Sequence, residues 1–221
     1  MANLKEIRIR IGSISSTMQI TSAMKMVSAA KLKKAQDAIT AMRPYAEKLT
    51  ELIQNISATL EGDASGVYAE QREVNKVLLV VVTSNRGLCG AFNANVIKAT
   101  RNLIDVTYAG KQVDVITIGK KGFDAFSKST NVIANNSNLY DALTFNNTAE
   151  IAQRIMDAFV EGTYDKVEVI YNQFKNAATQ IVQVEQFLPL LPVVNEKAAA
   201  SDYIFEPSKE EIILKQKEEV C

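Results

Sequence analysis

The feature that most constrains this chain is a seven-residue hydrophobic repeat that starts near its N-terminus. Alternating steps of three and four residues from Leu4 to Leu60 reach an apolar side chain at fourteen of seventeen positions. A period of 3.5 residues kept up over this length is typical of one strand of a left-handed coiled coil. The repeat predicts a helix over residues 1–60, about 85 Å long at roughly 1.5 Å per residue, with Asn3 as its cap and a kink at Pro44.

The repeat is interrupted at three consecutive seam positions, which hold Thr21, Lys25 and Ser28. In this stretch the apolar side chains move to other faces of the helix: Ile20, Ala23, Met24, Met26, Val27 and Ala30. A surface helix normally has one apolar stripe and one polar face. We therefore expect apolar neighbours around residues 20–30 beyond a single coiled-coil partner, the alternative being a local drift of the stripe without functional meaning.

Charge is unevenly distributed along the chain, although the 25 basic and 25 acidic residues balance overall. Residues 1–60 hold nine Lys/Arg and four Asp/Glu, a net charge of +5, which leaves −5 on the remainder. Such asymmetry indicates that the N-terminal helix meets an acidic partner. The simpler interpretation is a long helix with lysines on its solvent face.

Several kinds of chemistry are excluded by the residues that are missing. The chain has no histidine, which removes Ser-His-Asp and Cys-His catalysis and histidine-ligated metals. Its two cysteines, Cys89 and Cys221, are far apart and predict neither a disulfide framework nor a zinc site, so a reducing compartment is expected. We predict no catalytic residue, cofactor, metal or nucleic-acid site, and no membrane insertion, because no run of about 18 apolar residues occurs.

After a polar linker at residues 61–74, the pattern changes to alternating strands and helices. Continuous β-branched runs predict buried strands, and a run of alternating polarity predicts an antiparallel or edge strand at 179–189. The predicted buried strands are 75–84, 112–119 and 165–173, and the predicted helices are 94–106, 120–128 and 147–162, the last opened by Asn147 and Glu150. This order predicts a Rossmann-like, mainly parallel α/β domain over residues 75–207.

The C-terminal residues predict one more helix. Ser208 and Glu211 form a capping box at the start of residues 208–221. An isolated helix of this length is marginal in water, and no second long heptad repeat occurs in the sequence. We expect the partner of the N-terminal helix to come from another molecule, or from a C-terminal part that this chain lacks.

The segment SNRGLCGAFN, residues 84–93, follows the first predicted strand, where a Rossmann-like sheet would bind phosphate. Its glycines, Gly87 and Gly90, do not form G-x-G-x-x-G, and Cys89 lacks an activating histidine. A tight turn explains these glycines. A nucleotide- or ligand-binding enzyme with a helical oligomerisation arm stays open as one alternative, and a coiled-coil adaptor as another.

Four blocks of sequence resemble, in the same order, the gamma subunits of F-type ATP synthases. The blocks are IRIRIGSISSTMQITSAMKMVSAAKLKKAQ (7–36), RPYAEKL (43–49), SNRGLCGAFNANV (84–96) and YNQFKNAATQ (171–180). The resemblance implies a central rotor shaft whose N- and C-terminal helices form an antiparallel coiled coil. Proton flow turns such a shaft, and its asymmetry changes the nucleotide affinities of catalytic sites on other subunits.

The resemblance also implies partners and a location. The shaft would lie inside a ring of alpha and beta subunits, and its Rossmann-like domain beside the epsilon subunit and the c ring of the membrane sector. It would be a peripheral protein at the cytoplasmic face of a bacterial inner membrane, without bond chemistry or a nucleotide of its own. Family members continue with a long C-terminal helix, so we expect that most of this helix is missing here.

Two groups of contact residues follow from the same resemblance. We call the first group the neck residues, because they would lie where the shaft meets an acidic loop of beta: Ile20, Met24, Lys25, Val27 and Lys31. The second group would lie on the surface of the middle domain near the same junction, and it consists of Arg86, Leu88 and Cys89.

Overall fold

The computed structural model describes residues 3–59, 67–176 and 178–190. It divides into two compact units, Met1–Ile53 and Gln54–Cys221, which are described separately below. Within the described residues, no helix has both the length and the apolar character needed to span a membrane.

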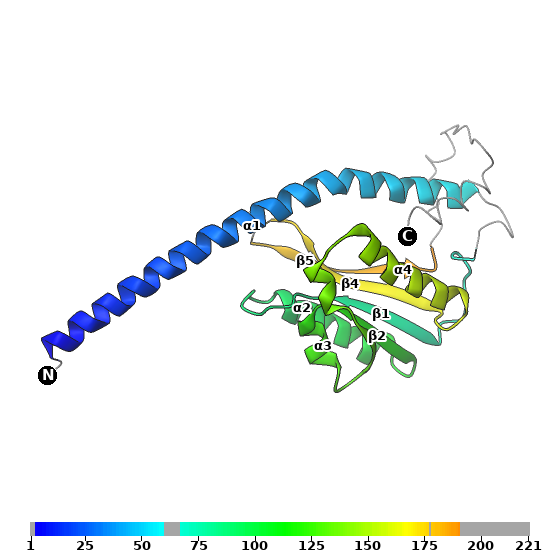
Figure 1. The fold of residues 1–221 in the computed structure, drawn as a ribbon. Helices are drawn as coiled ribbons and strands as arrows, with labels where there is room; N and C mark the ends of the chain where they lie inside the picture. The colour runs from blue at the N-terminus through cyan, green and yellow to red at the C-terminus, as the bar shows by residue number, and fades with distance from the viewer. Residues whose placement is uncertain (1–2, 60–66, 177, 191–221) are drawn as a thin grey trace. The chain divides into compact units, whose positions relative to one another are not determined.

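The first unit lies within one long helix, α1, which runs from Leu4 to Thr59 over 56 residues (Figure 1). Its start is capped by Asn3, whose side-chain oxygen accepts a hydrogen bond from the backbone N–H of Lys5 (3.3 Å). The helix continues through Pro44, because a proline removes only one backbone donor and helix-forming residues flank it on both sides. The long helix predicted from the heptad repeat is confirmed.

The second unit contains a five-stranded sheet with strand order β3-β2-β1-β4-β5. Four strands are parallel, and β5 pairs antiparallel with β4. The strands are β1 (Lys76–Val82), β2 (Gln112–Ile118), β3 (Asn131–Asn135), β4 (Lys166–Phe174) and β5 (Gln180–Leu188). The mainly parallel Rossmann-like sheet predicted from the sequence is confirmed, as is the antiparallel edge strand.

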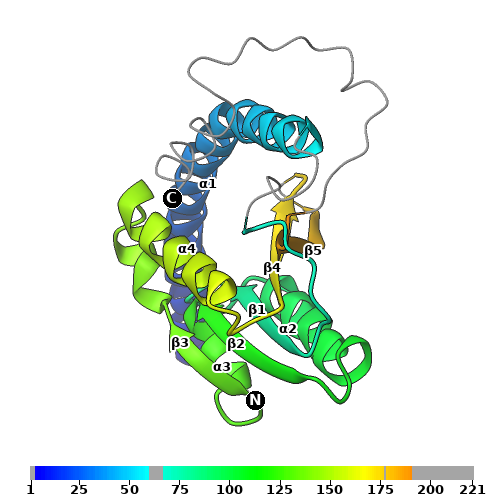
Figure 2. The same ribbon diagram turned by 90° about the vertical axis from the view of Figure 1, so that its right-hand side faces the viewer.

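Helices cover both faces of this sheet (Figure 2). On one face, α2 and α3 pack Val96 and Phe126 against Val77, Leu79 and Val115. On the other face, α4 packs its own apolar stripe against β1, β2 and β4 through Ile151, Ile155 and Phe159. The helices are α2 (Phe92–Asn102), α3 (Lys120–Phe126) and α4 (Phe145–Val160). Because both faces are covered, β1 is a continuous run of apolar residues.

Three local features differ from the sequence prediction. Strand β3 was not predicted: it has five residues, it lies at the edge of the sheet, and Asn131 and Asn135 at its ends give it a polar character. Helix α2 continues into a π-helical turn at Leu103–Thr107. Helix α4 is opened by Thr144 and not by Asn147, because the Thr144 hydroxyl accepts the backbone N–H of Asn147.

The strand order places a topological switch point between β1 and β4. From β1 the chain moves outward to β2 and β3, and it then returns to add β4 on the other side of β1. The segment that joins β1 to α2 leaves the carboxyl end of β1 at this switch point; we call residues 83–91 the β1–α2 turn. The predicted end of the domain at residue 207 and the predicted helix at 208–221 lie outside the described residues.

Candidate partner-contact site

The neck residues lie on α1 and are exposed to solvent. Ile20, Met24, Val27 and Lys31 follow one another at helical spacings of four, three and four residues, so they share one stripe of the helix surface. The apolar side chains of this stripe are 63%, 65% and 57% exposed, in the order given. Lys25 lies beside the stripe and is also exposed. The structure therefore brings the predicted neck residues together on a short length of helix.

One polar position of the heptad seam, Thr21, and the neighbouring Thr17 have their hydroxyl donors satisfied within the helix. Thr21 donates its hydroxyl to the carbonyl of Thr17 (2.6 Å), and Thr17 donates to the carbonyl of Ser13 (2.9 Å). Each hydroxyl is thus satisfied within the helix, so this face can be covered by protein without leaving a donor unpaired. Thr21 therefore allows a partner to cover the helix at the point where the apolar seam is interrupted.

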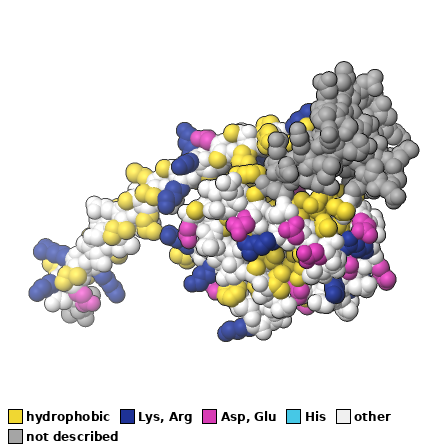
Figure 3. Space-filling view, turned by 45° about the vertical axis from the view of Figure 1, so that its right-hand side comes forward, with side chains coloured by type: hydrophobic (Ala, Val, Ile, Leu, Met, Phe, Trp, Pro, Cys, Tyr) yellow, Lys and Arg dark blue, Asp and Glu magenta, His cyan; other side chains and the backbone are white. Residues whose placement is uncertain are grey.

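Large apolar side chains are exposed along most of α1, and not only at the neck. Figure 3 shows them between lysine and arginine side chains on the visible face of the helix. A helix that leaves so many apolar side chains exposed needs another surface to cover them. The residues concerned, besides those of the neck, are Leu4, Ile7, Ile9, Ile11, Ile14, Met18, Met26, Leu32, Ile39, Met42 and Tyr45.

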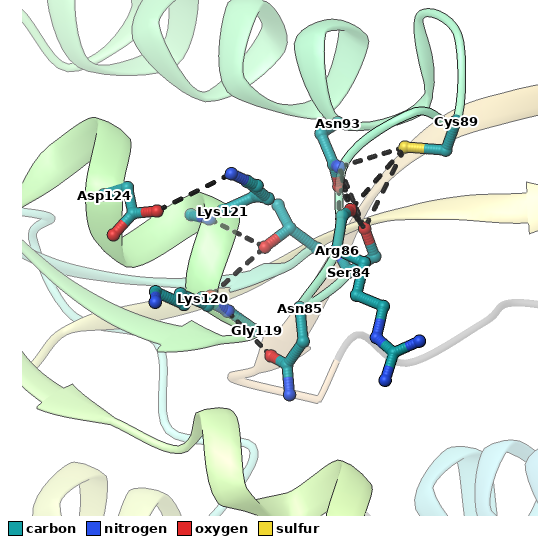
Figure 4. A network of polar contacts seen from close by, with 11 residues as sticks. Ser84, Asn85, Arg86, Cys89, Asn93, Gly119, Lys120, Lys121 and Asp124 are labelled. Atoms are coloured by element: carbon teal, nitrogen blue, oxygen red, sulfur yellow. Dashed lines mark hydrogen bonds and ion pairs between the residues drawn. The ribbon is translucent and has the colours of Figure 1, made fainter.

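The β1–α2 turn is held together by the side chain of Asn93, which lies in the first turn of α2 and is only 9% exposed (Figure 4). Its Oδ1 accepts the backbone N–H of Ser84 (2.9 Å). Its Nδ2 donates to the carbonyl of Arg86 (3.3 Å) and to Sγ of Cys89 (3.1 Å). One buried amide thus fixes the beginning, the middle and the end of the turn.

Further hydrogen bonds tie the turn to neighbouring segments. Asn85 donates its side-chain amide to the carbonyl of Ser137 (2.8 Å) and accepts the N–H of Lys120 (2.8 Å) at the start of α3. The buried hydroxyl of Thr83 accepts the N–H of Gly122 (2.8 Å). The sequence prediction did not include Asn85 or Asn93. Their signal is the pair of asparagines that flanks the glycine turn, since Asn commonly satisfies backbone groups in turns.

The three predicted contact residues of this turn have different orientations. Leu88 has a φ of 60° and is fully exposed, at 110% of its reference area. Arg86 is exposed, and Figure 4 shows its guanidinium pointing away from the hydrogen-bonded cluster. Cys89 is an exposed free cysteine whose sulfur is engaged by Asn93. The side chains of Leu88 and Arg86 therefore point outward, and the thiol of Cys89 points toward the side chain of Asn93.

The switch point, where doubly wound sheets commonly bind ligands, is bridged by protein groups. Asn172 near the end of β4 donates its side-chain amide to the carbonyl of Phe92 at the start of α2 (2.8 Å). No cluster of three His, Cys, Asp or Glu side chains that could hold a metal occurs in the described part of the chain.

Buried charges elsewhere in the sheet have partners of their own. Asp114 accepts hydrogen bonds from the side chains of Tyr164 and Asn131 (2.8 Å each), and burial together with this carboxylate raises the pKa of Tyr164. Glu168 forms an ion pair with Lys166 (2.7 Å). Asp114 of β2 thus bonds to Asn131 of β3, whereas Lys166 and Glu168 pair within β4, where Oε2 of Glu168 is buried without a hydrogen-bond partner among the described residues. We therefore take the exposed surfaces described above as the candidates for function.

Fold and surface together define a class of protein: a Rossmann-like α/β domain that carries one long helix suited to contact with other chains. A sequence model of the family described as ATP synthase matches residues 3–219. Among curated proteins, the ATP synthase gamma chain of Flavobacterium psychrophilum is 72% identical over 215 residues, which cover 97% of this chain and 75% of the relative. That of Christiangramia forsetii is 57% identical over 213 residues, covering 96% and 74%. The chain belongs to the ATP synthase gamma chain family.

Solved structures give the same result at the level of the fold. A chain in the structure titled as the central stalk and c ring of the Tetrahymena thermophila mitochondrial ATP synthase has a TM-score of 0.62 at 25% identity, over 89% of this chain and 85% of that one. A chain of the Euglena gracilis mitochondrial ATP synthase rotor has a TM-score of 0.57 at 21% identity, over 96% and 74%. The fold, a long helix followed by a mainly parallel sheet, is thus shared with chains of ATP synthase central stalks.

Proposed function

We propose that this chain is the central rotor shaft of an F-type ATP synthase and couples proton flow through the membrane sector to ATP synthesis or hydrolysis in the alpha–beta ring. One observation carries the proposal. The 56-residue helix α1 leaves most of its described large apolar side chains exposed, in a chain that is 72% identical to an ATP synthase gamma chain. A shaft of this kind transmits torque by shape and contact, and it performs no bond chemistry of its own.

The neck residues are proposed to contact the beta subunit. Ile20, Met24 and Val27 supply an exposed apolar stripe, which Lys31 extends. Lys25 adds a second cation beside the stripe. Apolar contact gives such an interface its affinity, while the cations favour a partner surface with acidic side chains.

The sheet domain is proposed to contact further subunits. Arg86, Leu88 and Cys89 would lie near beta, and the rest of the domain would meet the epsilon subunit and the c ring. The similar Tetrahymena thermophila chain belongs to a structure of a central stalk and c ring, which supports the c-ring part of this assignment. We place the chain at the cytoplasmic face of a bacterial inner membrane, as a peripheral part of the complex.

Disulfide cross-linking in the assembled complex tests the neck. Lys25→Cys is placed in a Cys89→Ser, Cys221→Ser background, opposite a cysteine in the acidic loop of beta. Oxidation is expected to give a beta-linked product and to stop ATP hydrolysis, and reduction is expected to restore it. The matched control is Glu150→Cys in the same background, because its side chain is 72% exposed on α4 of the sheet domain.

Two outcomes would count against the proposal. If Lys25→Cys gives no more beta-linked product than Glu150→Cys, the neck assignment is wrong. Calorimetry tests the enzymatic alternative: binding of ATP, ADP or a dinucleotide to the chain tighter than about 10 µM, roughly 7 kcal/mol, would favour a nucleotide-binding enzyme over a shaft.

A further inference from the structure

The segment that leads into the sheet from α1 is fixed in place although it contains neither helix nor strand. We call residues 67–75 the strap; they precede β1 and lie almost entirely within the predicted linker at 61–74. Tyr68, Arg72 and Val74 are half-buried in it, while Glu70 and Glu73 are exposed. Since no helix or sheet ladder satisfies the backbone of this segment, individual contacts hold it on the domain.

Arg72 makes three of these contacts with its guanidinium. Nη1 donates a hydrogen bond to the carbonyl of Phe159 in the last turn of α4 (2.9 Å). The same guanidinium lies over the ring of Phe159, with 5.0 Å between Cζ and the ring centroid. Nη2 pairs with the carboxylate of Glu70 within the strap (2.6 Å). Because the Arg72 side chain is only 21% exposed and Phe159 is completely buried, this arginine joins the strap to the hydrophobic core of the domain.

The carboxyl end of α4 is well suited to a guanidinium. The last carbonyls of a helix lack intrahelical partners and carry partial negative charge, which favours a cation. After α4, Gly162 turns the chain with a φ of 73°, and a Cβ added there would lie 3.7 Å from Nη1 of Arg72. A lysine would supply the charge, but its ammonium lacks the planar fork that bonds to Phe159 and Glu70 and stacks on an aromatic ring at the same time. The site therefore favours arginine over lysine.

The strap is also joined to the segment through which the chain leaves the sheet. The backbone N–H of Leu190, which follows β5, donates to the carbonyl of Tyr68 (2.8 Å). Tyr68 and Leu190 both pack against the core cluster that contains Phe159. The entry to the sheet and the exit from it are thus bonded to each other and to the same core that Arg72 contacts.

Along the chain, the strap lies on the path between α1 and the sheet. Residues 60–66 connect Thr59, at the end of α1, with the strap, and the strap leads directly into β1. A torque that passes through the backbone between the helix and the sheet therefore acts on the strap first. If the strap were loosely attached, part of each angular step would deform the strap and would not turn the domain.

We propose that Arg72 is a positioning residue for torque transmission: it clamps the strap to the carboxyl end of α4, so that the entry and exit segments form one fixed anchor for the shaft. This inference rests on the proposed rotor function and refines it. It assigns a place within the chain itself where torque passes between the helix and the sheet domain, and it requires no residue of another subunit.

The first test measures torsional stiffness in the alpha–beta ring bound to this chain. A rod is attached to Lys128→Cys, an exposed position of the sheet domain, in a Cys89→Ser, Cys221→Ser background, and the ring is stalled with a non-hydrolysable ATP analogue. The thermal variance of the rod angle is inversely proportional to the stiffness. Arg72→Met keeps the length of the side chain and removes its donors, and it is expected to raise this variance about twofold or more. Arg72→Lys is expected to give an intermediate value.

The matched control is Arg154→Met, on the same helix α4. Arg154 is 65% exposed, and it pairs with Glu150 at 3.7 Å. Because exposed ion pairs contribute little, this variant is expected to leave the variance of the rod angle unchanged. Both methionine variants are expected to hydrolyse ATP at the unmodified rate when no load is applied, since the chain performs no bond chemistry.

Amide hydrogen exchange of the isolated chain tests the clamp separately. Arg72→Met is expected to speed exchange of the Leu190 N–H about tenfold or more, because a charged hydrogen bond and a cation–π contact no longer oppose local opening of the strap. Exchange of the Ile116 N–H is expected to stay unchanged, since β2 has neighbouring strands on both sides. This contrast distinguishes release of the strap from a general loss of stability.

The outcomes separate the two proposals. If ATP does not drive rotation of the rod on the unmodified chain, the proposed function is wrong. If the rod rotates and Arg72→Met has the same angular variance as the unmodified chain, the role in torque transmission is wrong and the rotor function stands. The clamp is also overturned if Arg72→Met speeds exchange equally at Leu190 and Ile116, or if Arg154→Met raises the angular variance as much as Arg72→Met does.

Discussion

The long helix and the sheet domain use apolar side chains in opposite ways. In the sheet domain, Val77, Leu79 and Phe126 are completely buried between strands and helices. In α1, apolar residues such as Ile20 and Met24 remain mostly exposed. The domain therefore carries its own core, while the helix depends on contacts that other protein surfaces must supply, because a helix gains most of its stability from the packing of its apolar face.

One glycine in each region gives the strongest test of this difference. At Gly119, φ is 109° and an added Cβ would lie 2.1 Å from the carbonyl oxygen of Thr83. Gly119→Ala is therefore expected to lower the free energy of unfolding by more than about 4 kcal/mol and to prevent folding of the domain. At Gly12, in mid-helix, nothing lies within 4 Å, and Gly12→Ala is expected to stabilise α1 by about 0.5–1 kcal/mol.

The two effects can be followed separately. Six of the seven tyrosines lie outside α1, and the chain has no tryptophan, so near-ultraviolet circular dichroism reports mainly on the second unit. Far-ultraviolet signal follows the helices. If Gly119→Ala and the unmodified chain had equal urea midpoints, the close approach of Gly119, after β2, to the backbone of Thr83, after β1, would not be required for stability.

Truncation of large side chains gives the next largest contrast. Phe159→Ala removes a completely buried ring from beneath α4, and the expected loss is about 3–5 kcal/mol of unfolding free energy. Met24→Ala on α1 is expected to change the stability of the isolated chain by less than about 0.5 kcal/mol. Urea unfolding measures both. If Met24→Ala lowers the unfolding free energy of the isolated chain as much as Phe159→Ala does, the contrast between the helix and the sheet domain is wrong.

A change of pH gives the smallest expected effect, and it acts on the sheet. Burial, followed by the hydrogen bond to Glu185, raises the pKa of Tyr171 from 10.0 to about 12. Because the folded state holds this proton more tightly, the stabilisation is complete below pH 10 and is lost as the pH rises toward about 12.

Tyr171→Phe should reduce this alkaline loss, which is measured by urea midpoints across the same pH range and by the absorbance of tyrosinate. The variant keeps the ring and removes only the titrating hydroxyl. An unchanged pH dependence in Tyr171→Phe would assign the alkaline transition to other groups, such as Tyr164, whose pKa is raised in the same direction.

The elements that the sequence predicted are those with a strong local signal. The heptad repeat of α1 and the β-branched runs of β1, β2 and β4 can be recognised from residues that are close together in the sequence. Strand β3 has no such signal, because an edge strand of five residues pairs on one side only and carries asparagines at both ends. The cap at Thr144 was missed for a similar reason, since Asn147 offers an equally suitable side chain nearby.

By itself, then, the sequence determined that the chain has a long helix in need of partners, joined to a mainly parallel sheet, since apolar periodicity is a local property. The tertiary structure decided which residues of the β1–α2 turn face outward. Asn93 bonds to Ser84, Arg86 and Cys89 because the turn between β1 and α2 folds back on its own side chain. The exposed, left-handed Leu88 follows from the folded turn, because a backbone conformation set by individual side-chain hydrogen bonds leaves no periodic trace in the sequence.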